Sequence, residues 1–106
     1  FAFLHDLGRE NEYRDPEHGY RAAEIAAQIA GDLIDVTAQE LLLLQDACMG
    51  HSEGHMVADV TVMTCWDADR LDLGRVGIRP NPTRLCNEVA RRPEVVAMAY
   101  ERSIRV

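Results

Sequence analysis

An adjacent histidine and aspartate, His5 and Asp6, form the first group in the sequence that could hold a metal ion. The pair follows the apolar residues 1–4, so we expect it in the last turn of a core helix, which Gly8 ends in the left-handed conformation. From there an imidazole nitrogen and a carboxylate oxygen can reach one ion from neighbouring directions. These donors suit a borderline or hard divalent cation. A His-Asp pair by itself more often marks a solvated helix end, so the hypothesis needs further ligands.

A second polar group, the segment 66–72 (Trp-Asp-Ala-Asp-Arg-Leu-Asp), carries three carboxylates and one arginine. Asp69 continues a helical stripe that includes Val62 and Trp66, so its carboxylate is expected to point toward the core. A carboxylate in such a place needs a cation or hydrogen-bond donors to offset its desolvation. Asp67 lies off this stripe. The alternative interpretation is a helix end that dissolves in water.

Together these two segments resemble the HD-domain superfamily of metal-dependent phosphohydrolases. The resemblance is carried by residues 3–8 (Phe-Leu-His-Asp-Leu-Gly) and 67–72 (Asp-Ala-Asp-Arg-Leu-Asp), and it covers nearly the whole chain. Members are helical and share a metal site made of an early histidine, an adjacent His-Asp pair and a late aspartate. The resemblance therefore implies that His5, Asp6 and Asp69 bind one divalent metal. It does not distinguish Mn, Mg, Zn, Fe, Co or Ni.

The early histidine of the family has no counterpart here, because the sequence begins only four residues before His5. Since Phe1 starts abruptly within an apolar segment, we expect a fragment of an HD domain that lacks its N-terminal helix. The alternative is that another histidine takes the place of the early one. If the natural protein also lacks it, both metal affinity and activity would be affected.

Three further histidines, His18, His51 and His55, lie between the His-Asp pair and Asp69. They resemble the intervening histidines with which some HD members hold a second metal, and binding of substrate phosphate is the other role that we consider. His18 lies on an apolar helix face, where a hydrogen-bonded core histidine is the alternative. His51 follows a predicted helix end. His55 has glycine-flanked neighbours that also suit an ordinary surface histidine.

The resemblance implies hydrolysis of a small, nucleotide-like phosphomonoester or phosphodiester. A water acidified by the metal would attack phosphorus, and an arginine would hold the phosphoryl oxygens as negative charge grows. Arg70, beside the implied ligand, is the candidate for that contact, with an i-to-i+3 surface pairing to Asp67 as the alternative. Asp67, Glu10 or Glu12 could orient or deprotonate the water.

Two other functions stay open. One is a binding or regulatory module that keeps the HD scaffold without turnover and senses a nucleotide or a metal, which the missing early histidine would favour. The other is an HD oxygenase with two iron ions, for which the additional histidines would be the ligands. Occupancy by two metals and redox chemistry would distinguish it from a hydrolase.

The composition limits the class of protein. A chain of 106 residues with 47% hydrophobic and 27% charged residues suits one globular domain, residues 1–106. A net charge of −7 without a basic stripe argues against polymeric nucleic acid as a partner. All eleven basic residues are arginines, which excludes lysine chemistry but allows bidentate binding of phosphate. The composition leaves oligomerisation open.

The sequence has no apolar run near the roughly 20 residues that a membrane helix needs, so we expect a soluble protein with no membrane contact. Cys48, Cys65 and Cys86 include no Cys-x-x-Cys pair. Each suits a small buried hydrophobe rather than a nucleophile. A reducing, cytoplasmic location follows as an expectation.

An all-helical fold, an HD-like bundle, is expected to position these groups. Asp15-Pro16 and the capping box of Thr37 with Glu40 predict two helix starts. Residues 57–72 have the composition of a strand but the spacing of a helix, and we predict a helix because no second strand of similar quality exists for pairing. In chain order the predicted helices span about residues 1–7, 16–31, 38–50, 57–72, 82–90 and 93–105.

Overall fold

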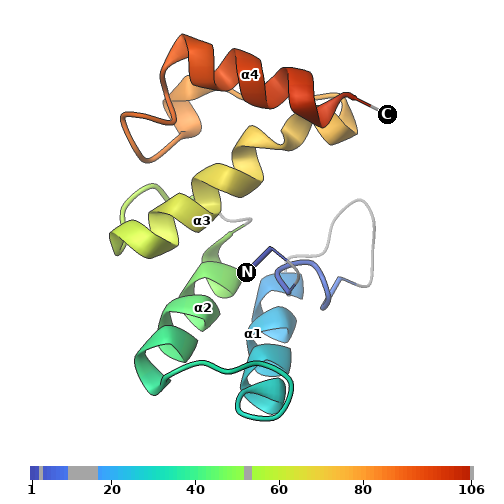
Figure 1. The fold of residues 1–106 in the computed structure, drawn as a ribbon, viewed down its shortest axis with the longest axis vertical. Helices are drawn as coiled ribbons and strands as arrows, with labels where there is room; N and C mark the ends of the chain where they lie inside the picture. Colours follow the sequence, from blue (N-terminus) through green and yellow to red (C-terminus); the bar gives the residue numbers. More distant parts are fainter. Residues whose placement is uncertain (3, 10–16, 52–53, 106) are drawn as a thin grey trace. The chain divides into compact units, whose positions relative to one another are not determined.

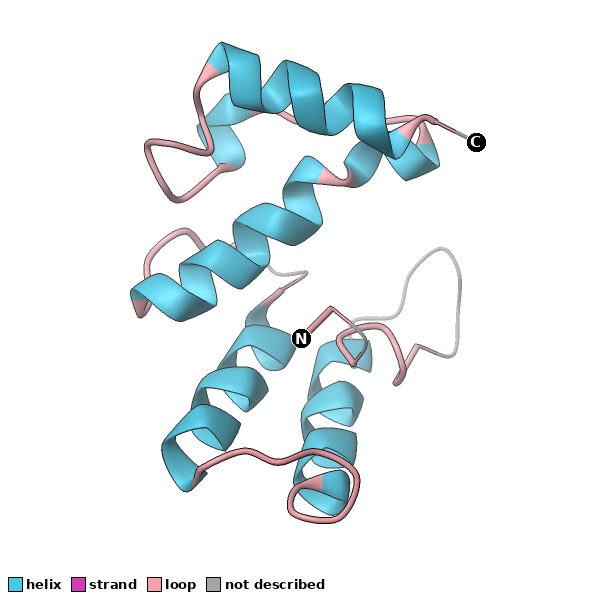
Figure 2. Cartoon of the chain, viewed as in Figure 1, coloured by secondary structure: helices cyan, strands magenta, loops and turns pink. Residues whose placement is uncertain are grey.

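The structure, a computed structural model, describes residues 1–2, 4–9, 17–51 and 54–105. These residues form four α-helices and two short 3-10 helices and no β-strand, so the all-helical fold is confirmed (Figure 2). The chain divides into two compact units, Phe1–His55 and Met56–Val106, and the structure defines each unit internally. The HD-like arrangement of the helices and the single domain over residues 1–106 stay predictions.

The first unit is built on two helices, α1 (His18–Ile29) and α2 (Ala38–Gly50), which lie side by side (Figure 1). The predicted capping box at the start of α2 is confirmed. The Thr37 side chain accepts a hydrogen bond from the Glu40 backbone N–H at 3.1 Å, and the Glu40 carboxylate accepts one from the Thr37 N–H at 2.9 Å. Two of the N–H groups that a helix start leaves without partners are thereby satisfied.

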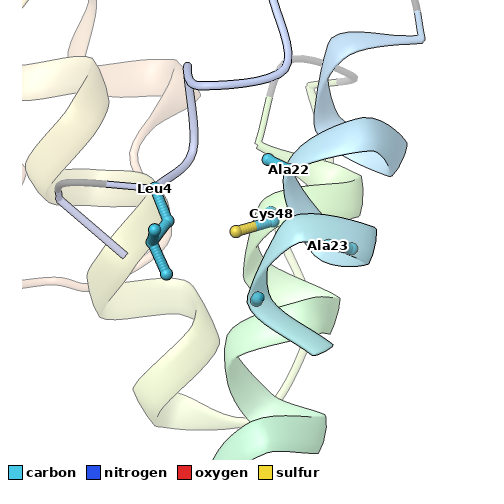
Figure 3. Close-up of a cluster of buried hydrophobic side chains, with 5 residues drawn as sticks. Leu4, Ala22, Ala23 and Cys48 are labelled. Atoms are coloured by element: carbon cyan, nitrogen blue, oxygen red, sulfur yellow. The ribbon is translucent and has the colours of Figure 1, made fainter. Parts of the chain in front are cut away.

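Small side chains fill the interface of α1 and α2. Ala22, Ala23 and Ala26 of α1 face Cys48 of α2, and all four are buried. Leu4 from the N-terminal segment covers this cluster (Figure 3). Because alanine and cysteine occupy so little volume, the backbones of the two helices can approach closely.

The start of α1 differs from the sequence-based expectation. The helix begins at His18, with Glu17 at the N-cap position and no side-chain capping bond from it. The expected cap at Asp15-Pro16 lies outside the described residues. At its other end α1 stops at Ile29, two residues before the glycine that we expected to end it. Gly31 instead lies in the following turn, with φ of 85°, a conformation open to glycine at little cost.

The prediction of a helix over residues 1–7 is wrong. The described residues there form consecutive turns, with one helix-like bond from the His5 N–H to the Phe1 carbonyl at 3.0 Å. Gly8 also has a different role from the left-handed helix end that we expected. A Cβ at Gly8 would lie 2.6 Å from the His18 carbonyl oxygen and 2.5 Å from the Arg21 Cβ, so glycine is required for close packing against α1.

The second unit contains α3 (Val60–Leu71), η1 (Leu73–Val76), η2 (Pro82–Arg84) and α4 (Pro93–Ser103). The predicted helices over 57–72 and 93–105 are confirmed. Helix α3 starts later and ends earlier than predicted, and α4 starts as predicted but ends earlier. Helix α3 starts at Val60 because the Asp59 side chain accepts the Thr61 N–H at 2.9 Å. Among the described residues, no helix combines the length and apolar character needed to cross a membrane.

The predicted helix over residues 82–90 is mostly wrong. Asn81 caps η2 as expected, but the chain leaves the helical conformation at Leu85, whose ψ is 142°. Immediately afterwards, the N–H groups of Cys86 and Asn87 donate to the Asp67 carboxylate of α3. This tertiary pairing replaces the intrahelical bonds that the sequence pattern favoured. Leu85 becomes a fully buried centre of the core of this unit.

Candidate metal centre

Three ligand-bearing side chains converge inside the first unit: Asp6, His18 and His51. His18 is the first residue of α1, and His51 directly follows α2. Their Nε2 atoms are 2.6 Å apart. The Asp6 Oδ1 lies 3.5 Å from the His18 Nε2 and 3.7 Å from the His51 Nε2. All three ligand atoms lie within 4.8 Å of one another, so the group could hold one metal ion.

The orientation of His51 is set by the backbone of α2. Its Nδ1 lies 2.7 Å from the Cys48 carbonyl oxygen. A carbonyl oxygen only accepts, so Nδ1 carries the hydrogen. In neutral His51, Nε2 is then the nitrogen that carries the lone pair, and it faces His18 and Asp6. Metal-binding histidines are commonly oriented by such a bond from the other ring nitrogen.

A glycine beside His18 makes this arrangement sterically possible. A Cβ on Gly19 would overlap the carbonyl oxygen of Cys48, the same oxygen that accepts from His51. Glycine at this position therefore lets the start of α1 approach the end of α2. No local signal in the sequence indicates this role of Gly19, because it depends on a contact with Cys48, 29 residues later.

His5 lies next to the same cluster. Its Nε2 is 3.3 Å from the Asp6 Oδ2, and its Nδ1 is 3.1 Å from the Phe1 carbonyl oxygen. Its ring stacks on Phe1 at a centroid distance of 4.6 Å and meets the His51 ring edge-on at 4.9 Å. The two oxygens of Asp6 are thus directed at different histidines, one at His5 and the other at His18 and His51.

Arg9 also reaches this cluster, although the sequence analysis did not single it out. Its Nε lies 3.7 Å from the Asp6 Oδ1, and its Nη2 lies 3.4 Å from the His18 Nε2. The available signal was the i-to-i+3 spacing from Asp6, which is common on helices and turns without any function.

Three other residues that the sequence indicated as candidates are His55, Glu10 and Glu12. His55 is exposed at the end of the first unit and is not one of the three converging ligands. Glu10 and Glu12, proposed to orient water, lie outside the described residues. Their roles stay predictions.

Asp69, the predicted late ligand, belongs to the second unit. Its side chain is 17% exposed, and its Oδ1 lies 3.6 Å from the Arg75 Nη2. Arg75 also donates from Nε to the Asp72 Oδ2 at 3.0 Å. The inward placement expected from the helical stripe agrees with this low exposure. The convergence of Asp69 with His5 and Asp6 stays a prediction.

Asp67, which lies off the helical stripe of Asp69, is buried. It is 3% exposed. Its Oδ1 accepts the Cys86 N–H at 2.6 Å, while its Oδ2 accepts the N–H and the Nδ2 of Asn87, each at 2.8 Å. Three donors offset the desolvation of the carboxylate. These contacts give Asp67 a structural role, which is to hold the segment after η2 against α3.

Arg70, the predicted phosphate ligand, also contacts the segment after α3. Its Nη1 donates to the Arg84 carbonyl at 2.8 Å and lies 3.5 Å from the Cys86 Sγ. Its guanidinium lies over the Trp66 ring, 5.7 Å from the centroid. The role of Arg70 in phosphate binding stays a prediction.

The three cysteines are free thiols. Burial raises the pKa of the Cys86 thiol, and the Asp67 carboxylate raises it further. Burial likewise raises the pKa of the partly buried Cys65. A raised pKa keeps sulfur protonated and weakly nucleophilic, which agrees with the interpretation of these residues as small hydrophobes.

The donor set in the first unit, one carboxylate and two imidazoles, fits a divalent transition metal. The Cys48 carbonyl oxygen accepts a hydrogen bond from the His51 Nδ1 and so orients this ring as a metal ligand requires. Comparisons of the chain with protein-family models, with curated proteins and with solved structures gave no match. A functional proposal therefore rests on the chemistry of the described side chains and on the motif resemblance of residues 3–8 and 67–72.

Proposed function

We propose that this protein is a metal-dependent phosphohydrolase of the HD type that acts on a small, nucleotide-like phosphate ester. The observation that carries the proposal is the convergence of Asp6, His18 and His51 in the first unit, with ligand atoms within 4.8 Å. These residues come from a turn, a helix start and a helix end, so local sequence does not account for their meeting. The resemblance of residues 3–8 and 67–72 to HD proteins supplies the reaction class.

The nature of the donors favours some metals over others. Imidazole nitrogens suit Zn, Fe, Co, Ni and Mn, while Mg prefers an all-oxygen shell that retains several waters. Two of the three donors here are imidazoles. We therefore propose a transition metal held by Asp6, His18 and His51. In the HD arrangement, His5 and Asp69 would complete the centre.

The chain's own residues would bind and orient the reacting groups. Asp6 would supply negative charge next to a bound cation, while the buried imidazoles of His18 and His51 would hold the cation without adding charge. Asp6 is 44% exposed, so the centre is open to a ligand on the carboxylate side. A bound divalent ion would acidify water and offset charge on the phosphoryl group.

The experiment that tests this proposal is a metal titration followed by an activity panel. Protein treated with a chelator is titrated by calorimetry with Mn, Mg, Zn, Fe(II), Co and Ni. Each loaded form is then assayed on p-nitrophenyl phosphate, bis-p-nitrophenyl phosphate and a set of nucleotides. We expect transition-metal binding and release of phosphate or nitrophenol.

The other outcomes identify the alternatives. Metal or nucleotide binding without turnover on any ester would indicate the regulatory module. Oxygen consumption that requires two irons per chain would indicate the oxygenase. Absence of metal binding would reject the proposal. The matched control is Asp46→Ala, which removes an exposed carboxylate from α2 and should leave metal binding unchanged.

A further inference from the structure

We propose that Arg9 is the residue that binds the phosphoryl oxygens of the substrate at this centre. The inference rests on the proposed function, because it names the contact through which that site would recognise its ligand. Arg9 lies three residues after Asp6 and contacts both Asp6 and His18.

The position of the guanidinium suits a group that meets an incoming anion. Its Nη2 lies 3.4 Å from the His18 Nε2, and its Nε lies 3.7 Å from the Asp6 Oδ1. The Arg9 side chain is 33% exposed, whereas that of His18 is 2% exposed. The Arg9 side chain is therefore accessible to a soluble ester, whereas the His18 ring that it contacts is buried.

The charge of the centre suits an anionic ligand. A divalent ion bound by the Asp6 carboxylate and two neutral histidines would keep one net positive charge. Arg9 adds a second positive charge beside it, which favours binding of a phosphate dianion. A guanidinium also presents paired N–H donors that match two phosphate oxygens.

Two other arginines have contacts of a different kind. The Arg21 Nε donates to the Gly8 carbonyl at 2.5 Å, and the Arg70 Nη1 donates to the Arg84 carbonyl at 2.8 Å. Both bonds fasten one segment of backbone to another. The contacts of Arg9 with Asp6 and His18 are instead with the side chains of the candidate centre itself.

The experiment compares inorganic phosphate binding by the wild type and by Arg9→Gln, both loaded with Mn²⁺. Phosphate affinity is measured as product inhibition and by calorimetry, and p-nitrophenyl phosphate is the substrate. We expect Arg9→Gln to weaken phosphate binding and raise KM by at least about tenfold, equivalent to about 1.4 kcal/mol. Mn²⁺ affinity should be unchanged or higher, because a positive neighbour is removed.

Three variants make the result specific. Arg9→Lys keeps the charge and should recover part of the phosphate affinity, which a purely structural role would not explain. Arg105→Gln removes an exposed arginine that pairs with Glu101 and should have no effect. Arg70→Gln tests the residue predicted from sequence. Circular dichroism checks that each variant is folded.

The outcomes separate this inference from the proposed function. If the wild type binds Mn²⁺ and turns over substrate while Arg9→Gln has the same KM and phosphate affinity, Arg9 does not bind the phosphoryl group. A loss of phosphate affinity in Arg70→Gln alone would assign the contact to Arg70 and overturn the inference as well. If the wild type binds no metal, the proposed function fails, and the Arg9 inference fails with it.

Discussion

The Nε2 atoms of His18 and His51 lie 2.6 Å apart, although 33 positions separate the two residues in the sequence. The His51 Nδ1 carries a hydrogen because it faces the Cys48 carbonyl at 2.7 Å. Neutral His51 therefore offers a lone pair at Nε2. Two lone pairs at this separation would repel, so the 2.6 Å contact requires a hydrogen on the His18 Nε2 that is donated to His51. The adjacent Asp6 carboxylate favours positive charge at that point.

Removal of the Asp6 carboxylate should abolish the preference for positive charge next to the His18 and His51 rings. We expect Asp6→Ala to lose Mn²⁺ binding and phosphatase activity while most of the helix content is retained, because Asp6 lies outside the helices. Calorimetry and circular dichroism measure the two properties. The metal should also raise the melting temperature of the wild type but not that of the variant. Full metal occupancy and turnover in Asp6→Ala would make Asp6 an ordinary turn residue.

Joint replacement of His18 and His51 by alanine tests whether the two rings act at the site. We expect turnover on p-nitrophenyl phosphate to fall more than about tenfold, or about 1.4 kcal/mol of transition-state stabilisation. Both side chains are buried, so the variant will also be less stable and is assayed well below its melting temperature. Unchanged kinetic constants would return both histidines to a structural role.

Local signals in the sequence predicted local structure well. The capping box of Thr37 and Glu40 involves residues only three positions apart, so its geometry does not depend on the rest of the fold. The inward face of α1 was likewise predicted from spacing, and His18 is buried as expected. The predicted pair of His5 and Asp6 is adjacent in the sequence, and the contact between their side chains is equally local.

Features that depend on distant partners could not be predicted. Gly8 looked like a helix end, but its role is set by the His18 carbonyl and Arg21 of α1. Asp67 lies off the apolar stripe of its own helix. Its burial is explained by donors on Cys86 and Asn87, 19 and 20 residues later. Helical spacing predicts the direction in which a side chain points. It does not predict which distant segment of the chain packs against that side chain.

The structural role of Asp67 predicts a loss of stability without a specific loss of catalysis. Asp67→Asn replaces one carboxylate oxygen by an amide that cannot accept, and we expect the free energy of unfolding to fall by about 2–4 kcal/mol. Urea unfolding followed by the fluorescence of Trp66, which is in the same helix, measures the change. Asp72→Asn, at an exposed position, is the control. Wild-type stability with lost turnover would support the water-orienting role predicted from sequence.

The capping box predicts a pH dependence of stability. Hydrogen bonds with the backbone and side chain of Thr37 lower the pKa of Glu40. A lowered pKa means that ionised Glu40 stabilises the folded state above the ordinary glutamate pKa of about 4.3, and that this stabilisation is lost as the pH falls through the lower folded value. The wild type should therefore be more stable than Glu40→Gln at pH 7, and the difference should vanish toward pH 3. A difference that persists at pH 3 in chemical unfolding would exclude this cause.

Gly19 provides a test of how the packing of the helices controls the candidate centre. The added methyl group in Gly19→Ala would overlap the Cys48 carbonyl oxygen, so either α1 and α2 separate or the carbonyl turns away from the His51 Nδ1. Overpacking of this kind costs about 1–3 kcal/mol, and loss of the carbonyl would free His51 to exchange tautomers. We expect weaker Mn²⁺ binding together with a changed ¹⁵N signal pattern of His51. The control is Glu24→Gly at an exposed position of the same helix, which destabilises α1 by about 1 kcal/mol through its lower helix propensity but adds no atom near Cys48. If both variants bind Mn²⁺ equally well at a temperature where both are folded, the close approach at Gly19 contributes to stability alone.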